Sequence, residues 1–131
     1  MKVIDSSTLV KYFAKEEGWR EAGRSLAEGT VTVDLALKEV ANALLKKYRR
    51  GEIAREVVVE VVRDLLRAGA VVMVRQEEVL EEALLMAMRH GITVYDTLFI
   101  ALAKARSLDL VTSDVKQAEA AEKAGVRVVL V

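Results

Sequence analysis

The sequence contains no cysteine, no proline and only one histidine, His90. Without cysteine the chain can form neither disulfide bonds nor thiolate-bound zinc sites. A lone histidine makes no convincing zinc site either, and the position of His90 just before Gly91 indicates the end of a helix. A metal site in this chain would therefore be built mainly from oxygen ligands, which favour Mg²⁺, Mn²⁺ or Ca²⁺.

Long hydrophobic runs and a net charge are also missing. The apolar segments are far too short to cross a bilayer, and the N-terminus runs straight into a predicted strand without a signal-peptide pattern. We therefore expect a cytoplasmic protein with no membrane partner. The 20 basic and 20 acidic residues balance, so nucleic acid could be bound only by a local basic patch. Phosphate-loop, dinucleotide-binding and Gly-x-Ser-x-Gly signatures are absent.

What the chain does have is a regular alternation of strand-like and helix-like segments. Its 131 residues, 53% of them hydrophobic, predict one domain over residues 1–131 with a single core. β-branched runs predict strands at 2–5, 31–33, 71–74, 109–112 and 126–130, with a short extended piece at 93–95. Helices are predicted at 7–14, 17–28, 35–50, 53–68, 76–90, 96–106 and 115–124. This order predicts an α/β fold with a mostly parallel sheet.

Three aspartates stand where an extended run meets a predicted helix: Asp5, Asp96 and Asp114. Aspartate is a common helix N-cap, so each could simply cap its helix. Each junction, however, also carries a hydroxyl that could serve as the cap. The carboxyl ends of parallel strands share one edge of the sheet, where ligands bind. Carboxylates gathered there would repel one another unless a cation neutralised them.

Two predicted helices have unusual apolar patterns. The segment 96–106 is apolar nearly all round, which is typical of a buried helix, so Asp96 would stand at the mouth of the interior. The segment 53–68 is apolar over more than one face, which is wider than packing on a sheet requires. We expect part of that surface to meet another chain.

Glu39 is a fourth candidate acid, on the predicted helix 35–50. Counting about 100° per residue puts it nearly opposite the apolar stripe of that helix, together with Lys46 and Arg50. Periodicity alone is compatible with an exposed, salt-bridged face. It is equally compatible with an acid next to two bases that grip phosphate.

Four segments of the chain resemble the motifs of PIN-domain nucleases, most closely the VapC-type toxins of toxin–antitoxin pairs. They are Val3–Ser7, Glu39–Leu44, Val94–Ala103 and Leu110–Asp114, in the order of that family and over the full length of the chain. The resemblance implies a three-layer α/β/α sandwich around a five-stranded sheet. It also implies that Asp5, Glu39, Asp96 and Asp114 form a metal-binding active site for RNA cleavage, supported by the hydroxyls of Ser7 and Thr112.

Carboxylate-bound Mg²⁺ or Mn²⁺ suits such a reaction, since it can activate water and neutralise developing charge. We expect Asp5 and Asp96 to bind the metal directly, with Asp114 and Glu39 completing the site and Glu39 helping to activate water. Lys46 and Arg50 at the rim would hold the RNA backbone. The resemblance further implies products with a 5′-phosphate.

The resulting hypothesis is a metal-dependent endoribonuclease that acts as the toxin of a VapBC-type pair. Its partners would be an RNA substrate, a cognate antitoxin and a second copy of the chain in a homodimer. One alternative is a PIN-fold module for protein interaction or RNA binding whose catalysis is unimportant. Another is an RNA-processing nuclease without an antitoxin; the small size and the lack of an appended RNA-binding domain favour the toxin.

Overall fold

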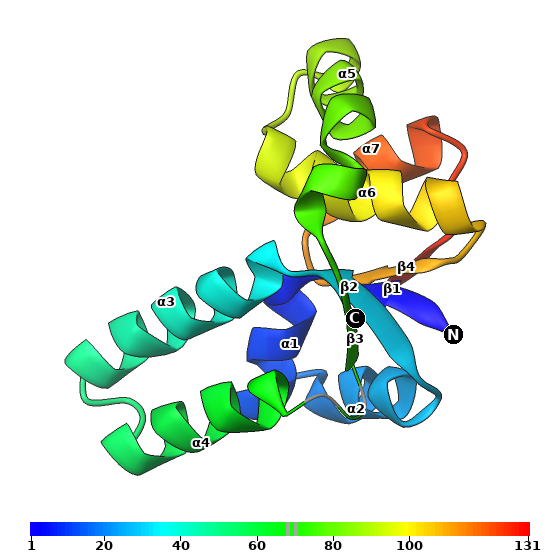
Figure 1. The fold of residues 1–131 in the computed structure, drawn as a ribbon. Helices are drawn as coiled ribbons and strands as arrows, with labels where there is room; N and C mark the ends of the chain where they lie inside the picture. Colours follow the sequence, from blue (N-terminus) through cyan, green and yellow to red (C-terminus); the bar gives the residue numbers. More distant parts are fainter. Residues whose placement is uncertain (68, 70) are drawn as a thin grey trace.

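A sheet of five parallel strands forms the centre of the protein, which we describe from a computed structural model for residues 1–67, 69 and 71–131 (Figure 1). The strands are β1 (Lys2–Ile4), β2 (Thr30–Val33), β3 (Val71–Val74), β4 (Leu110–Thr112) and β5 (Val128–Leu130). Their order across the sheet is β3-β2-β1-β4-β5, and each pairing between them is parallel. The prediction of a mostly parallel five-stranded sheet is confirmed.

The order of the strands contains a reversal next to β1. From β1 the chain builds the sheet outward through β2 and β3, and it then returns to place β4 and β5 on the other side of β1. Val3 accordingly pairs with Val31 of β2 on one side and with Leu110 of β4 on the other. In open parallel sheets such a reversal leaves a crevice at the carboxyl ends of the two central strands. Here those strands are β1 and β4.

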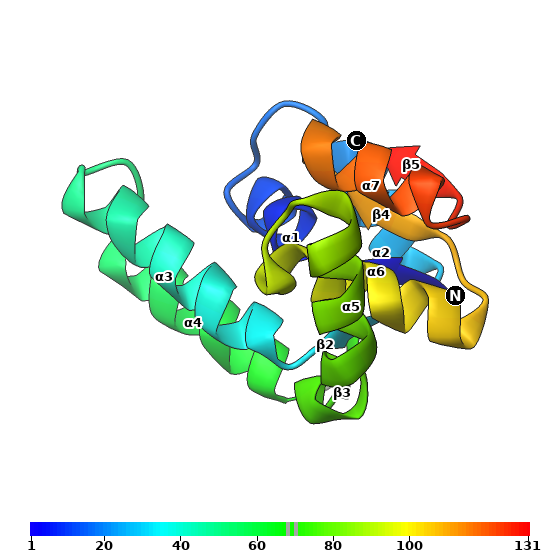
Figure 2. The ribbon, with the colours of Figure 1, turned by 90° about the horizontal axis from the view of Figure 1, so that it is seen from above.

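Helices cover both faces of the sheet and make the three layers of an α/β/α sandwich (Figures 1 and 2). One face carries α1 (Ser6–Phe13), α2 (Trp19–Ala27), α3 (Leu35–Arg49) and α4 (Arg55–Leu66). The other carries α5 (Leu80–His90), α6 (Val94–Arg106) and α7 (Val115–Lys123). Helices α3 and α4 pack against each other and project away from the sheet, as Figure 2 shows from above.

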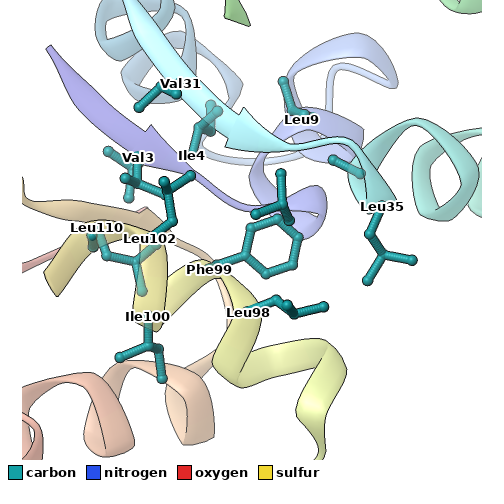
Figure 3. Packing of buried hydrophobic residues seen from close by; sticks show 14 of the residues in the cluster. Val3, Ile4, Leu9, Val31, Leu35, Leu98, Phe99, Ile100, Leu102 and Leu110 are labelled. Atoms are coloured by element: carbon teal, nitrogen blue, oxygen red, sulfur yellow. The ribbon is translucent and has the colours of Figure 1, made fainter. Parts of the chain in front are cut away.

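Helix α6 is the most deeply buried helix of its layer. Its residues Thr97–Ala103 are all buried, which confirms the interpretation of the apolar segment 96–106. Phe99 and Leu102 face the strands, whereas Ile100 points to the opposite side (Figure 3). Burying side chains of this size contributes about 1.5–3 kcal/mol each, so the position of α6 on the sheet is firmly fixed. Among the described residues, no helix is both long and apolar enough to span a bilayer.

The predicted extended piece at 93–95 is wrong. Val94 and Tyr95 already belong to α6, and Thr93 is its N-cap, with its hydroxyl accepting the N–H of Asp96. A β-branched and aromatic run looks like a strand by propensity, but this capping bond and the packing of α6 override that preference. Asp96 therefore lies in the first turn of a helix and does not follow a strand.

Other elements are shorter than predicted. The predicted helix 76–90 is a 3₁₀ turn, Gln76–Glu78, followed by α5. The predicted helix 53–68 is α4, which begins at Arg55 and ends at Leu66; residue 68 lies outside the described residues. The last strand covers only Val128–Leu130 of the predicted 126–130.

Candidate active site

Asp5, which follows β1 directly, is 3% exposed and is held by four hydrogen bonds. Its Oδ1 accepts from the N–H and the hydroxyl of Thr8, at 3.0 and 2.6 Å. Its Oδ2 accepts from the hydroxyls of Ser7 and Thr112, both at 2.7 Å. Burial raises the pKa of this carboxyl, while the hydrogen bonds partly offset the rise. The structure thus brings the two candidate supporting hydroxyls onto the candidate acid.

Asp114 begins α7, just beyond the end of β4. Its Oδ1 accepts the N–H groups of Lys116 and Gln117, at 2.9 and 3.2 Å, so it is the N-cap of this helix. Asp5 is likewise the N-cap of α1. The hydroxyls at these two junctions could have served as caps, but the carboxylates take that role, since they accept from backbone N–H groups more strongly. A cap uses one oxygen of Asp114, and no hydrogen bond from the described residues reaches the other.

Glu39 lies on α3 and contacts α1 across the site. Its Oε1 accepts the hydroxyl of Ser6 at 2.7 Å, and the side chain is half-buried. The periodicity of α3 placed Glu39 on an outward face, but α1 packs against that part of α3 and covers it. Burial raises the pKa of Glu39 most, Ser6 lowers it, and the negative charges of Asp96 and Asp5 raise it further.

Asp96 completes the group from the first turn of α6. Burial raises its pKa most, and the charges of Asp114 and Asp5 add to the rise, while the hydroxyl of Thr93 opposes it. The charges of Asp5 and Asp96 thus reach Glu39, and those of Asp5 and Asp114 reach Asp96, so the four acids lie near one another. Among the described residues, however, no group of three or more acidic, histidine or cysteine side chains is arranged so that it could hold a metal ion as it stands. The arrangement of the four acids is therefore open.

A basic groove runs from this cluster along α3. It has a volume of about 390 Å³ and is lined by Glu39, Asn42, Ala43, Lys46, Lys47 and Arg50. Within the described ranges, Lys46 and Arg50 have no acid within ion-pair distance. The sequence was also compatible with a salt-bridged face at Lys46 and Arg50, and among the described residues α3 does not have one at these two positions. The side chains of Lys46 and Arg50 therefore present two positive charges, unpaired by any described acid, at the end of the groove away from Glu39.

Sequence reasoning missed two residues of this cluster. Ser6 binds Glu39, and Gln117, which is 1% exposed, binds both Thr112 and the backbone carbonyl of Asp96. Ser6 resembled a spare helix cap. Gln117 could have been noticed as one of very few amide side chains in the chain, standing one turn after Asp114. His90, by contrast, lies in the last turn of α5, as predicted.

Known proteins resemble this chain in sequence and in fold. A family model described as "PIN domain" matches residues 2–123. Ribonuclease VapC3 from Pyrobaculum aerophilum is 34% identical over 120 residues, which are 89% of this chain and 92% of the relative. The crystal structure of PAE2754 from the same organism has a TM-score of 0.74 at 21% identity, covering 97% of this chain and 87% of that one. A toxin–antitoxin complex from Klebsiella pneumoniae has a TM-score of 0.63 at 16% identity, covering 90% of each chain.

Proposed function

The chain belongs to the PIN domain family, and from that premise we propose that it is a metal-dependent endoribonuclease, the toxin of a VapBC-type pair in the cytoplasm. The relative that shares a third of its sequence over most of both chains is named a ribonuclease. The substrate would be single-stranded RNA, and the reaction would be hydrolysis of a phosphodiester bond that leaves a 5′-phosphate.

The observation that carries this proposal is the cluster of four acids at the crevice between β1 and β4. The charges of Asp5 and Asp96 raise the pKa of Glu39, and those of Asp5 and Asp114 raise the pKa of Asp96, so the folded protein concentrates negative charge there at a cost. A divalent cation removes that cost. The donors are carboxylates and the site contains no cysteine, which suits Mg²⁺ or Mn²⁺.

Each acid has a separate role in the proposed site. Asp5 and Asp96 would bind the metal directly, and Asp114 would complete the site with the oxygen that does not cap α7. Glu39, held by Ser6, would orient and activate the attacking water. When bound, the metal would supply a more acidic water and neutralise the charge that develops on the phosphate.

The RNA backbone would lie in the groove along α3. Lys46 and Arg50 stand about one turn apart and leave their charges unpaired by described acids. Phosphate contacts of this kind position a strand without selecting its sequence. They would hold the RNA so that a phosphodiester bond reaches Glu39 and the metal site.

The direct test is cleavage of single-stranded RNA by the purified chain. We expect activity with Mg²⁺ or Mn²⁺, products with a 5′-phosphate, and loss of activity in EDTA. Undiminished cleavage in EDTA would rule out this chemistry. Two alternatives remain in view: a module whose catalysis is unimportant predicts no Mg²⁺-dependent cleavage, and an RNA-processing nuclease predicts cleavage with no antitoxin partner.

The proposal includes two protein partners, an antitoxin and a second copy of the chain. The toxin–antitoxin complex in the Klebsiella structure motivates the first. The apolar pattern of α4 motivated the dimer, but its exposed side chains do not form one face: Val57 lies opposite Val59 and Leu66. We assign that scattered apolar surface to the antitoxin.

Helix α5 offers a better surface for the second copy. Leu80, Leu84 and Met88 recur every four residues and are exposed, Met88 at 72%, with Leu85 beside them. They lie on a different side of α5 from Ala83 and Met86, which are buried against the core. Among the described helices no other carries so continuous an exposed apolar stripe.

The charges on this stripe favour a copy of itself as the occupant. Glu81 stands on the apolar face near the start of α5, and Arg89 stands at its edge near the end. When two copies of α5 meet antiparallel about a twofold axis, Leu84 and Leu85 of each copy lie near the centre. Glu81 of each copy then approaches Arg89 of the other, and the two helix dipoles oppose favourably.

A further inference from the structure

Gln117 is linked by hydrogen bonds to three of the four acids: to Asp114 and Asp96 directly, and to Asp5 through Thr112. Its backbone N–H donates to Oδ1 of Asp114 at 3.2 Å. Its side-chain Nε2 donates to the backbone carbonyl of Asp96 at 3.0 Å. Its Oε1 lies 2.7 Å from the hydroxyl of Thr112, which in turn lies 2.7 Å from Oδ2 of Asp5. One residue thereby connects α7, α6, β4 and the end of β1.

The geometry leaves little freedom in how Gln117 is oriented. The carbonyl of Asp96 can only accept, so the amide NH₂ must face it and Oε1 must face Thr112. The hydroxyl of Thr112 also accepts the N–H of Asp114 at 3.0 Å. This hydroxyl has a single proton, which it can donate either to Oε1 of Gln117 or to Oδ2 of Asp5. The side chain of Gln117 is 1% exposed, so water cannot easily replace these bonds.

The connection lies where the fold most needs one. Asp96 comes from α6, which rests on the face of the sheet, whereas Asp5 and Asp114 come from the edge at β1 and β4. The acids repel one another and tend to spread. Apolar packing fixes the layer in which α6 lies but has no direction along the surface. A hydrogen bond from α7 to the first turn of α6 does have a direction, and it opposes the spreading.

We propose that Gln117 is a positioning residue that sets the distance of Asp96 from Asp5 and Asp114, and thereby the affinity of the site for divalent metal. This inference rests on the proposed function, because it needs those three acids to hold the ion. It adds a residue that contacts no metal and no RNA. Residues that orient metal ligands typically change metal affinity 10–100-fold when they are replaced.

The test measures Mg²⁺ binding by titration calorimetry, without RNA. Gln117→Met keeps the length of the side chain and removes both of its hydrogen bonds; Gln117→Leu is measured in parallel, so that one folded variant suffices. The control is Ala121→Gly, a buried position one turn beyond Gln117 on the same helix, where the change lowers stability through helix propensity and removes no side-chain hydrogen bond. Asp5→Asn reports whether the acids bind metal at all.

We expect Asp5→Asn to abolish measurable binding and the Gln117 variants to raise the Kd for Mg²⁺ about 10-fold or more. Ala121→Gly should lower the melting temperature and leave the Kd unchanged. If the Gln117 variants bind Mg²⁺ as the wild type does while Asp5→Asn does not, Gln117 has only a structural role and the proposed metal site stands. If Asp5→Asn binds normally, the metal site itself is wrong. An equal loss of affinity in Ala121→Gly would also overturn the positioning role, because general destabilisation would then explain it.

Discussion

At the scale of single residues, Asp5 combines a helix cap with the hydrogen bonds of the candidate site. Its Oδ1 caps α1, and its Oδ2 holds the hydroxyls of Ser7 and Thr112 beneath the crevice. Asp114 caps α7 with Oδ1 alone, and no hydrogen bond from the described residues reaches its Oδ2. The capping pattern that makes these positions look ordinary in the sequence therefore also orients their carboxylates.

Some of the site could be predicted at this scale and some could not. Asp5 and Asp114 stand out because each follows a strand, and strand ends in a parallel sheet share an edge. The place of Glu39 in the site could not be predicted from its helix, because its burial depends on α1, a contact between segments far apart in the chain. No sequence pattern indicates a role for Gln117, which becomes visible only when its hydrogen-bond partners are known.

The two unpaired bases of α3 lead to a prediction about RNA binding. Replacing Lys46 or Arg50 by Ala should raise KM for RNA and leave kcat nearly unchanged, because the contacts hold ground state and transition state alike. Each loss should also reduce the slope of log KM against log salt by about 0.7. The control is Arg106→Ala, an exposed base at the far end of α6. A fall in kcat with unchanged KM would contradict a backbone-binding role.

At the scale of elements, α6 separates what periodicity can predict from what it cannot. Its burial followed from an apolar composition on all sides, and the structure confirms it. Its start did not follow, because residues Thr93–Tyr95 have strand propensity and only the Thr93 cap decides the outcome. On helix α5, Met88 is largely exposed while Met86 is buried. Periodicity gives two faces of a helix, and tertiary contacts decide which one is covered.

The apolar stripe of α5 leads to a prediction about the dimer. Leu84→Glu would bury a charge at the centre of the proposed interface, so light scattering at micromolar concentration should find a monomer where the wild type is a dimer. Val59→Glu on α4 is the matched control, with similar exposure, and should remain dimeric. The reverse pattern would move the interface to α4, and a monomeric wild type would remove the dimer from the proposal.

At the scale of the whole molecule, the alternation of elements was sufficient to predict a parallel sheet with helices on both faces. The alternation does not determine the strand order, with its reversal between β1 and β4, since many orders satisfy it. That reversal brings the candidate site together, because it places Asp5 and Asp114 at the ends of neighbouring strands. The three-layer architecture and the grouping of the four acids were predicted from the family resemblance and not from local sequence patterns.

The raised pKa values lead to a prediction about stability and pH. Burial, together with the neighbouring acids in two cases, raises the folded-state pKa of Asp5, Glu39 and Asp96. The folded protein therefore holds these protons more tightly than the unfolded chain, and their contribution to stability is lost as pH rises through the folded values. Without divalent metal, the melting temperature should fall as the pH rises above the ordinary carboxyl range, and it should fall more steeply for the wild type than for Asp96→Asn.

Added Mg²⁺ should reverse that trend in the wild type, because the ion binds the ionised carboxylates and competes with protons. Thermal melts across this pH range, with and without millimolar Mg²⁺, provide the measurement. A Mg²⁺ shift that is the same at pH 5 and at pH 8 would show that these acids do not bind the ion.

The measurement that tests the central claim most directly compares the wild type with Asp96→Asn in thermal melts at neutral pH, with and without millimolar Mg²⁺. The N–H of Asp96 is capped by Thr93, so an amide at this position leaves α6 intact. Stability without metal should stay level or rise, because one of four repelling charges is removed. Mg²⁺ should raise the melting temperature of the wild type clearly more than that of the variant, since an ion that binds only the folded state stabilises it according to its affinity. Equal shifts in the two proteins would mean that Asp96 does not hold the metal, and the proposed nuclease site would lose its central ligand.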